Sequence, residues 1–209
     1  MLRILLADDH AVVRQGVKQI LAEAFAQASF GEAENMHELL KLVRSGSWDI
    51  VVLDLSMPDG NGLEALKQIK CEYPLLPILI LSMYPVDQYG VRTIRAGASG
   101  YLNKESAPEE LVQAIGKILN GGVYISTSVA DELVMHARSE DDQPLHQHLS
   151  DREYQVLCLI ASGKEVKEIS TELSLSAKTI STYRARLMEK MNMDTNAELT
   201  YYAIKNGLV

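Results

Sequence analysis

The sequence contains little cysteine and no long hydrophobic run. Two cysteines, Cys71 and Cys158, lie in different halves of its 209 residues. Neither has a metal-binding or redox spacing, so we expect both to be reduced packing residues. No stretch approaches the roughly 18 consecutive apolar residues of a membrane-spanning helix, and the apolar run at Leu2 to Ala7 ends at two aspartates. We therefore expect a cytoplasmic protein with neither signal peptide nor membrane anchor.

The sequence also lacks an overall positive charge. Its formal net charge is −8, whereas a surface that binds nucleic acid must offset phosphate charge. The acidic excess lies in two segments. Residues 1–122 contain 11 basic and 15 acidic residues, and residues 123–148 contain 1 basic and 5 acidic residues. Residues 149–209 hold 8 of each, and within 176–190 four basic residues accompany one glutamate. The charge therefore leaves a modest basic surface in the last segment only.

The remaining composition, 47% apolar and 23% charged, is that of a globular protein, and the length suits two domains. In residues 1–122, short apolar runs alternate with amphipathic stretches, a pattern typical of a parallel sheet with helices on both faces. We predict an α/β domain whose doubly wound sheet has five strands, at 3–7, 29–34, 50–54, 78–83 and 100–102. Five helices should cover it, including 11–26, 62–71 and 107–120, the last capped by Ser106 and Glu109.

The chain changes character after Gly121-Gly122. Residues 123–148 read as a linker, with a short helix at 127–138 and a polar, acidic stretch at 139–144. From 149 to 209 the apolar period is helical throughout, which predicts a small all-α domain of four helices. Its capping signals are Ser150 with Glu153, Ser176, and Thr195 with Glu198.

Polar side chains follow the predicted strands of the sheet. Asp8 and Asp9 follow the first strand and Asp54 ends the third, while Ser82 lies in the fourth and Lys104 follows the fifth. Ligands bind at the carboxyl ends of parallel strands, so these groups should meet. Three carboxylates need a cation, and oxygen ligands suit Mg²⁺. With a lysine and a hydroxyl opposite, the site fits phosphoryl transfer to a carboxylate.

These motifs resemble the receiver domain of two-component response regulators. They are Leu5 to His10, Val52 to Gly62 with Asp54 and Pro58, Ser82, and Gly97 to Lys104 with Tyr101. The resemblance covers residues 1–122 and implies a flavodoxin-like fold. It also implies that Asp54 is the phosphoacceptor, and that Asp9, Asp54 and the carbonyl of Ser56 bind Mg²⁺, with Asp8 acting through water. Lys104 and Ser82 would contact the phosphoryl group, and Tyr101 would change rotamer with Ser82.

Taken singly, most of these residues have a simpler interpretation. An aspartate at a strand end is usually a cap or turn residue, and Met57-Pro58-Asp59-Gly60 is turn chemistry whatever the function. His10 follows the acidic pair, but at the start of a helix it is expected to be a surface residue. The four matched positions together favour the phosphoryl-transfer site.

The C-terminal domain contains a short turn between its second and third helices, Leu173-Ser174-Leu175-Ser176, which suits a helix-turn-helix. On a helical wheel, Ile180, Leu187 and Met191 share the packing face of the third helix. Residues near the start of a recognition helix read bases, while later basic residues hold phosphates. We predict that Lys178, Ser181 and Thr182 enter the groove, and that Arg184, Arg186 and Lys190 contact phosphates. A solvated helix face is the alternative.

Residues 149–209 resemble the LuxR-type helix-turn-helix of NarL/FixJ regulators, and 166–209 resemble the GacA/UvrY type. The resemblance rests on Leu149 to Glu153, Glu168 to Ile180 and Leu187 to Met191. It implies a transcription factor that is not an enzyme beyond its own phosphorylation and dephosphorylation. The implied partners are a sensor histidine kinase, promoter DNA, RNA polymerase and a second copy, in a homodimer formed when the protein is phosphorylated. In this family the last helix, here near 195–206, commonly forms a dimer contact, and the receiver is the alternative.

Two other functions remain open. The chain could bind DNA independently of phosphorylation, with its receiver as a dimerisation module. It could also be a phosphohydrolase of the haloacid dehalogenase type, which likewise forms an aspartyl phosphate. Those enzymes place a second aspartate two residues after the nucleophile, where this chain has Ser56.

Overall fold

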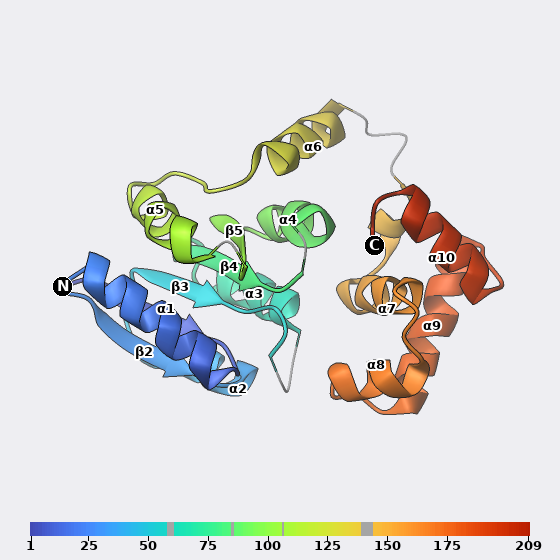
Figure 1. Cartoon of the computed structure of the whole chain (residues 1–209), viewed down its shortest axis with the longest axis horizontal. Coiled ribbons are helices and arrows are strands. Elements are labelled where there is room, and N and C mark those ends of the chain that lie inside the picture. Colours follow the sequence, from blue (N-terminus) through green and yellow to red (C-terminus); the bar gives the residue numbers. More distant parts are fainter. Residues whose placement is uncertain (58–60, 85, 106, 139–143) are drawn as a thin grey trace. The chain divides into compact units, whose positions relative to one another are not determined.

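The structure, a computed structural model, describes residues 1–57, 61–84, 86–105, 107–138 and 144–209 (Figure 1). It divides into two compact units, Met1–Ala130 and Asp131–Val209, which we treat separately. Three predicted features fall wholly or partly outside the described residues: the turn at Met57 to Gly60, the cap formed by Ser106 with Glu109, and the acidic stretch at 139–144.

The first unit contains a five-stranded parallel sheet, which confirms the predicted fold class. Its strands are β1 (Arg3–Ala7), β2 (Ser29–Ala33), β3 (Ile50–Leu53), β4 (Ile78–Ser82) and β5 (Gly100–Asn103), in the order β2-β1-β3-β4-β5. Every residue of β3 and β4 is buried, because helices cover both faces of the sheet. This burial explains why both strands are almost entirely apolar.

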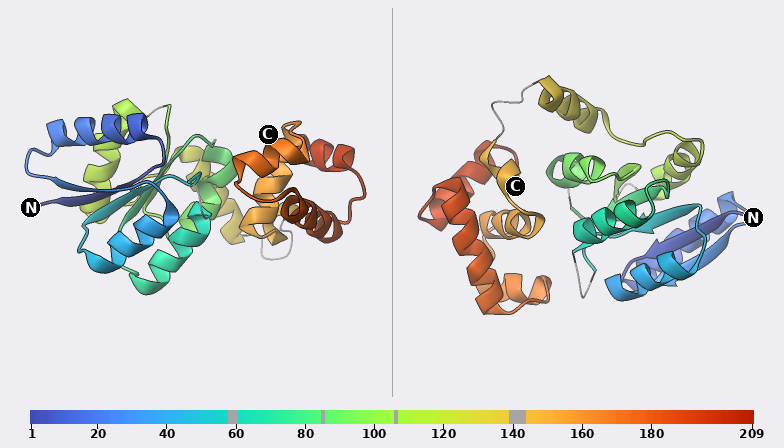
Figure 2. Two further views of the ribbon diagram at one scale, coloured as in Figure 1. Left: turned by 90° about the horizontal axis from the view of Figure 1, so that it is seen from below. Right: turned by 180° about the vertical axis from the view of Figure 1, so that it is seen from behind.

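The helices of this unit alternate with the strands along the chain. They are α1 (Ala11–Ala24), α2 (Met36–Ser45), α3 (Gly62–Glu72), α4 (Val86–Arg95) and α5 (Ala107–Leu119). Helices α1 and α5 pack together on one face, and α2 and α3 pack together on the other (Figures 1 and 2). The core under α1 and α5 is aliphatic, with Ile4, Val52 and Leu81 from the sheet and Leu21 and Ile115 from the helices.

The strand register brings the polar strand ends together. Ala7 of β1 pairs with Leu53 of β3, so Asp8 and Asp54 leave the sheet side by side. The backbone N–H of Asp54 then donates to the carbonyl of Ala7 at 2.9 Å. In the neighbouring strand pair, Ser82 of β4 pairs with Asn103 of β5, so Lys104 follows directly beyond the level at which β4 ends.

The segment after α5 begins as part of the sheet unit. Gly121 has a φ of +82°, and Tyr124 forms a parallel bridge with Gly100. Helix α6 (Thr127–Arg138) follows, as expected. The domain boundaries at 122 and 149 stay predictions, and the bridge shows that backbone pairing with β5 extends beyond residue 122.

The second unit contains the predicted four-helix domain. After a short 3₁₀ helix, η1 (Leu145–His148), come α7 (Asp151–Ala161), α8 (Val166–Glu172), α9 (Ala177–Met191) and α10 (Asn196–Lys205). Both predicted capping boxes form, at Ser150 with Glu153 and at Thr195 with Glu198. Helix α7 is central: it packs against α8, α9 and α10, and nearly all of its residues are buried. None of the described helices in either unit is long and apolar enough to cross a membrane.

Candidate functional site

An acidic cluster lies at the carboxyl ends of β1 and β3. Asp8 and Asp54 are 6% and 3% exposed, so their charges are largely removed from water. One ligand atom each from Asp8, Asp9, His10 and Asp54 lies within 4.8 Å of the others. Burying several carboxylates so close together is unfavourable unless a cation or a proton compensates. The cluster therefore requires a positive partner.

Lys104 supplies one positive partner from the turn after β5. Its Nζ lies 2.7 Å from Asp8 Oδ2 and 2.7 Å from Asp54 Oδ2, and only 6% of its side chain is exposed. Its backbone N–H donates to the Ser82 carbonyl at 2.9 Å, which fixes the start of the turn. Burial alone would lower the pKa of Lys104. The negative charges of Asp54 and Asp8, and the hydrogen bonds that Lys104 donates to them, outweigh burial and raise this pKa overall. The ammonium group therefore stays charged at neutral pH.

Asp54 is the most deeply buried carboxylate of the cluster. Burial raises the pKa of the Asp54 carboxyl above its ordinary value, and Lys104 and the Ser56 backbone offset only part of that effect. The Ser56 N–H donates to Asp54 Oδ1 at 3.1 Å, while Oδ2 accepts from Lys104. Both oxygens of the carboxylate are thus oriented, one by a backbone N–H and one by an ammonium group.

Ser82 and Tyr101 lie beside this cluster on β4 and β5. Both are buried, with exposures of 0% and 2%. The Tyr101 hydroxyl donates to the carbonyl of Tyr84 at 2.8 Å, and the ring therefore lies inward. Burial raises the pKa of the Tyr101 phenol. The N–H of Tyr84 donates to the Ser82 hydroxyl at 3.3 Å, so both predicted switch residues contact the backbone of Tyr84 in this structure.

The donors of the cluster suit a hard divalent cation. Asp8, Asp9 and Asp54 offer only carboxylate oxygens, the ligands that Mg²⁺ prefers. The buried Asp9 Oδ1 accepts no hydrogen bond. It lies 2.9 Å from His10 Nδ1, which can pair with it as a cation only when the imidazole is protonated. An unsatisfied carboxylate oxygen in an acidic cluster fits a metal ligand. His10 itself is largely exposed, as expected of a surface residue.

Sequence reasoning did not anticipate Arg14 as part of this region. Arg14 lies on the buried stripe of α1 with Val17 and Leu21, and its Nη1 donates to the carbonyl of Asp8 at 2.7 Å. The signal was present in the sequence, because an arginine at helical spacing from apolar core residues must find buried partners. Its partners, however, lie on other elements.

The predicted helix-turn-helix is formed by α8, a tight turn and α9. Ser174 in the turn has a φ of +52°, and the Ser176 hydroxyl caps α9 by accepting from the Thr179 N–H. Ile180, Leu187 and Met191 of α9 are buried, as the helical wheel predicted. The opposite face of α9 is thereby left to solvent.

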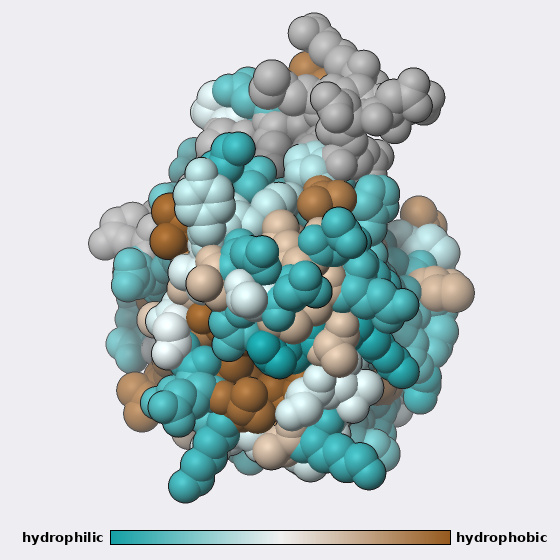
Figure 3. Space-filling model, turned by 90° about the vertical axis from the view of Figure 1, so that its right-hand side faces the viewer, coloured by the Kyte–Doolittle hydropathy of each residue, from teal (hydrophilic) through white to brown (hydrophobic). Residues whose placement is uncertain are grey.

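The candidate DNA-contacting residues differ in how they are held. Lys178, Ser181, Thr182 and Arg186 are exposed. The hydroxyls of Ser181 and Thr182 donate to carbonyls one turn earlier, which leaves them acceptor capacity for a ligand. Figure 3 shows a mostly hydrophilic surface with apolar side chains in separate small areas.

Two of the basic candidates have partners within the second unit. Arg184 Nε donates to Asn196 Oδ1 at 2.7 Å. Lys190 Nζ donates to Glu153 Oε2 at 2.6 Å, and the side chain of Glu153 is only 4% exposed. Burial raises the pKa of Glu153, but the hydrogen bonds from Lys190 and Ser150 lower it overall. Lys190 therefore joins α9 to α7, and its remaining N–H groups are available to a phosphate.

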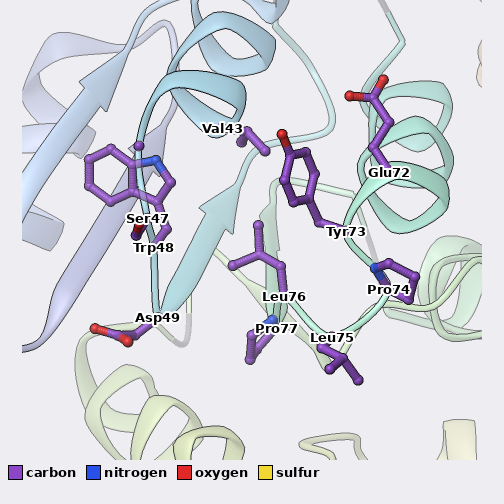
Figure 4. Close-up of a pocket in the computed structure, with 11 residues that line it drawn as sticks. Val43, Ser47, Trp48, Asp49, Glu72, Tyr73, Pro74, Leu75, Leu76 and Pro77 are labelled. Carbon is purple, nitrogen blue, oxygen red and sulfur yellow. The ribbon is translucent and has the colours of Figure 1, made fainter.

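A hollow of about 640 Å³ lies at the opposite end of the sheet from the acidic cluster. It is lined by the α2–β3 and α3–β4 connections, including Trp48, Tyr73 and Leu76 (Figure 4). Its acidic groups are already engaged. Glu72 pairs with Arg44 at 2.6 Å, and Asp49 accepts from the backbone of Arg3. The hollow contains none of the predicted site residues.

Two protein families match this chain, one in each unit. Residues 4–116 match the response regulator receiver domain, and residues 147–203 match the luxR family of bacterial regulatory proteins. Among characterised relatives, the response regulator UvrY of Escherichia coli is 36% identical over 209 residues, covering all of this chain and 96% of UvrY. The response regulator GacA of Pseudomonas aeruginosa is 35% identical, covering all of this chain and 98% of GacA.

Solved structures of RcsB are also similar. RcsB from Salmonella enterica serovar Typhimurium, bound to promoter rprA in the presence of the phosphomimetic BeF₃⁻, is 27% identical, with a TM-score of 0.64 over 97% of this chain and 98% of RcsB. A structure of two RcsB dimers bound to two parallel DNAs is 28% identical, with a TM-score of 0.60 and the same coverage. The similarity therefore extends across both units.

Proposed function

Since this chain belongs to the response regulators that join a receiver domain to a C-terminal luxR-family domain, we propose that phosphorylation of Asp54 controls its binding to promoter DNA. The observation that carries the proposal is the position of Lys104, 2.7 Å from both Asp8 and Asp54. A buried ammonium group at that place can neutralise a phosphoryl group on Asp54.

The phosphoryl donor in this proposal is a phosphohistidine of a sensor kinase. The bond between phosphorus and the histidine nitrogen breaks, and a bond forms to a carboxylate oxygen of Asp54. The histidine nitrogen takes a proton as it leaves. Lys104 then pairs with the new phosphoryl oxygens, while Ser82, at the end of β4, offers its hydroxyl as a donor.

Mg²⁺ would be held by Asp9, Asp54 and the carbonyl of Ser56, with Asp8 contributing through water. When bound, it would offset negative charge on the phosphoryl oxygens. The unsatisfied Asp9 Oδ1 supports this assignment.

The signal would leave the site through Ser82 and Tyr101. If Ser82 moves toward a phosphoryl group, its hydrogen bond with the Tyr84 N–H is lost, and the Tyr101 hydroxyl can exchange its own partner, the Tyr84 carbonyl. We propose that this change favours a homodimer whose α9 helices bind promoter DNA, near RNA polymerase in the cytoplasm. Lys178, Ser181 and Thr182 would enter the groove, and Arg184, Arg186 and Lys190 would hold phosphates. The functional domains would be 1–122 and 149–209.

Acetyl phosphate tests the chemistry of this site. The wild type incubated with acetyl phosphate and Mg²⁺ should gain one phosphoryl group, located at Asp54 by mass spectrometry, and Asp54→Asn should gain none. Equal incorporation in the two proteins would contradict the assignment. Absence of phosphate from the wild type, combined with tight DNA binding, would favour a DNA binder that acts independently of phosphorylation. Rapid turnover of small phosphoesters would favour a phosphohydrolase.

A further inference from the structure

Arg14 is a buried cation that contacts the backbone of the acidic cluster. It lies on the first turns of α1 and is 5% exposed. A buried charge is tolerated only when it is paired and its donors are satisfied. Arg14 meets this condition on three sides: Nε donates to Glu32 Oε2 at 2.9 Å, Nη2 to Glu34 Oε1 at 2.7 Å, and Nη1 to the Asp8 carbonyl at 2.7 Å.

The third of these bonds fixes the peptide between the two adjacent acidic residues. The Asp8 carbonyl belongs to the peptide unit that joins Asp8 to Asp9, and this unit is planar. The Asp8 N–H is already held by the carbonyl of Ala33 at 3.1 Å. Arg14 holds the other side of the residue, and its fork is anchored by the two glutamates at the end of β2. The direction in which Asp9 leaves the backbone therefore depends on the guanidinium group.

The side chain of Arg14 also contributes to the floor of the cluster. A small cavity of about 10 Å³, close to the size of one water molecule, is lined by Asp8, Arg14 and Asp54 together with apolar core residues. A shorter side chain at position 14 would enlarge this cavity beneath Asp54.

We propose that Arg14 is a positioning residue for the Mg²⁺ site: its guanidinium group holds the Asp8 carbonyl and thereby orients Asp9 toward the cation. The inference rests on the proposed function, because it takes the acidic cluster as the Mg²⁺ site. Residues that orient metal ligands typically change metal affinity by about 10-fold to 100-fold when they are replaced. Lysine would retain the charge and the aliphatic stem, but it cannot reproduce a planar fork with three directed bonds.

The test is Mg²⁺ binding to the full-length protein, measured by titration calorimetry without any phosphoryl donor. Arg14→Lys should raise the Kd for Mg²⁺ by about 10-fold, and Glu32→Gln, which weakens the anchor without touching the cluster, should raise it several-fold. Arg44→Lys is the matched control, because Arg44 also forms a two-bond pair with a glutamate, Glu72, but at the opposite end of the sheet. It should bind Mg²⁺ like the wild type.

Thermal unfolding of the same proteins separates positioning from simple stabilisation. A residue that only stabilises the fold would lower the melting temperature and leave the Kd for Mg²⁺ unchanged below that temperature. An unchanged Kd in folded Arg14→Lys and in Glu32→Gln would overturn the inference. If instead the wild type binds no Mg²⁺, or Asp9→Asn binds it equally well, the assignment of the metal site itself is wrong.

Discussion

Replacing Lys104 should reveal how strongly the receiver depends on one buried cation. Lys104→Met keeps most of the side-chain volume and removes the charge between Asp8 and Asp54. At an effective dielectric constant of about 20, each of the two charge pairs attracts by roughly 6 kcal/mol, and the burial of three charged groups offsets most of this attraction. Breaking a buried pair by removing one partner typically costs about 3–5 kcal/mol. We expect the lower end, about 3 kcal/mol, because a protonated Asp54 relieves part of the repulsion.

The assay is urea unfolding at pH 7, followed by the fluorescence of Trp48. Trp48 is the only tryptophan of the sequence and lies half-buried in the receiver, where its Nε1 donates to the carbonyl of Leu42. Its signal therefore reports unfolding of this unit in the full chain.

Two controls sharpen the measurement. Mg²⁺ should restore part of the stability lost in Lys104→Met, because the carboxylates regain a cation. In the Asp54→Asn background the same lysine replacement should destabilise the receiver less, with a coupling of at least about 1 kcal/mol between the two sites. A loss below about 0.5 kcal/mol in both backgrounds, a size typical of neutral surface changes, would refute the reasoning.

Three further predictions concern other parts of the chain. Glu153→Gln should destabilise the second unit at pH 7. The pKa of Glu153 is lowered in the folded state, so its carboxylate stabilises the fold above pH 4.5 and this stabilisation is lost as the pH falls through the folded pKa. Melting curves of the variant and the wild type, followed by circular dichroism, should therefore converge in acid. Lys178→Ala should weaken binding of the phosphorylated protein to promoter DNA by about 5-fold to 100-fold at fixed salt. If fluorescence-anisotropy titrations give the variant and the wild type the same affinity, Lys178 does not contact the DNA. Gly62→Ala should destabilise the receiver by about 1–3 kcal/mol, because the new Cβ would lie 2.5 Å from the Leu55 Cα. Gly116→Ala has open space around it and should stabilise α5 by about 0.5–1 kcal/mol. If urea unfolding finds Gly62→Ala more stable than Gly116→Ala, the packing described here is contradicted.

The elements of the fold could be predicted because their signals are local. The continuous apolar runs of β3 and β4 reflect burial on both faces of the sheet, and their predicted ends lie within one residue of those observed. Helices α7 and α10 of the second unit begin where a hydroxyl and a glutamate three residues later form a capping box. Tyr124 was assigned to a linker because its bridge to Gly100 depends on the completed sheet, not on neighbours in the sequence.

The sequence could predict that the acidic cluster and Lys104 lie close together, but not the geometry in which they do so. Parallel topology brings Asp8, Asp54 and Lys104 to one edge, so their proximity followed from the strand assignment. Their distances depend on partners far apart along the chain: Lys104 lies 50 residues from Asp54, and Arg14 lies 18 residues from Glu32, which anchors it. The position of Lys190 could be predicted only in part for the same reason. A helical wheel can place Lys190 on the exposed face of α9, but it cannot predict the hydrogen bond to Glu153, 37 residues earlier.

The central claim is that phosphorylation at Asp54 controls DNA binding, and one affinity comparison tests it most directly. The wild type and Asp54→Asn are each titrated onto promoter DNA at fixed salt, with Mg²⁺ and with or without beryllofluoride. We predict that beryllofluoride tightens binding of the wild type at least several-fold and leaves Asp54→Asn unchanged. Equal affinity of the wild type in both conditions, or the same gain in Asp54→Asn, would contradict the account.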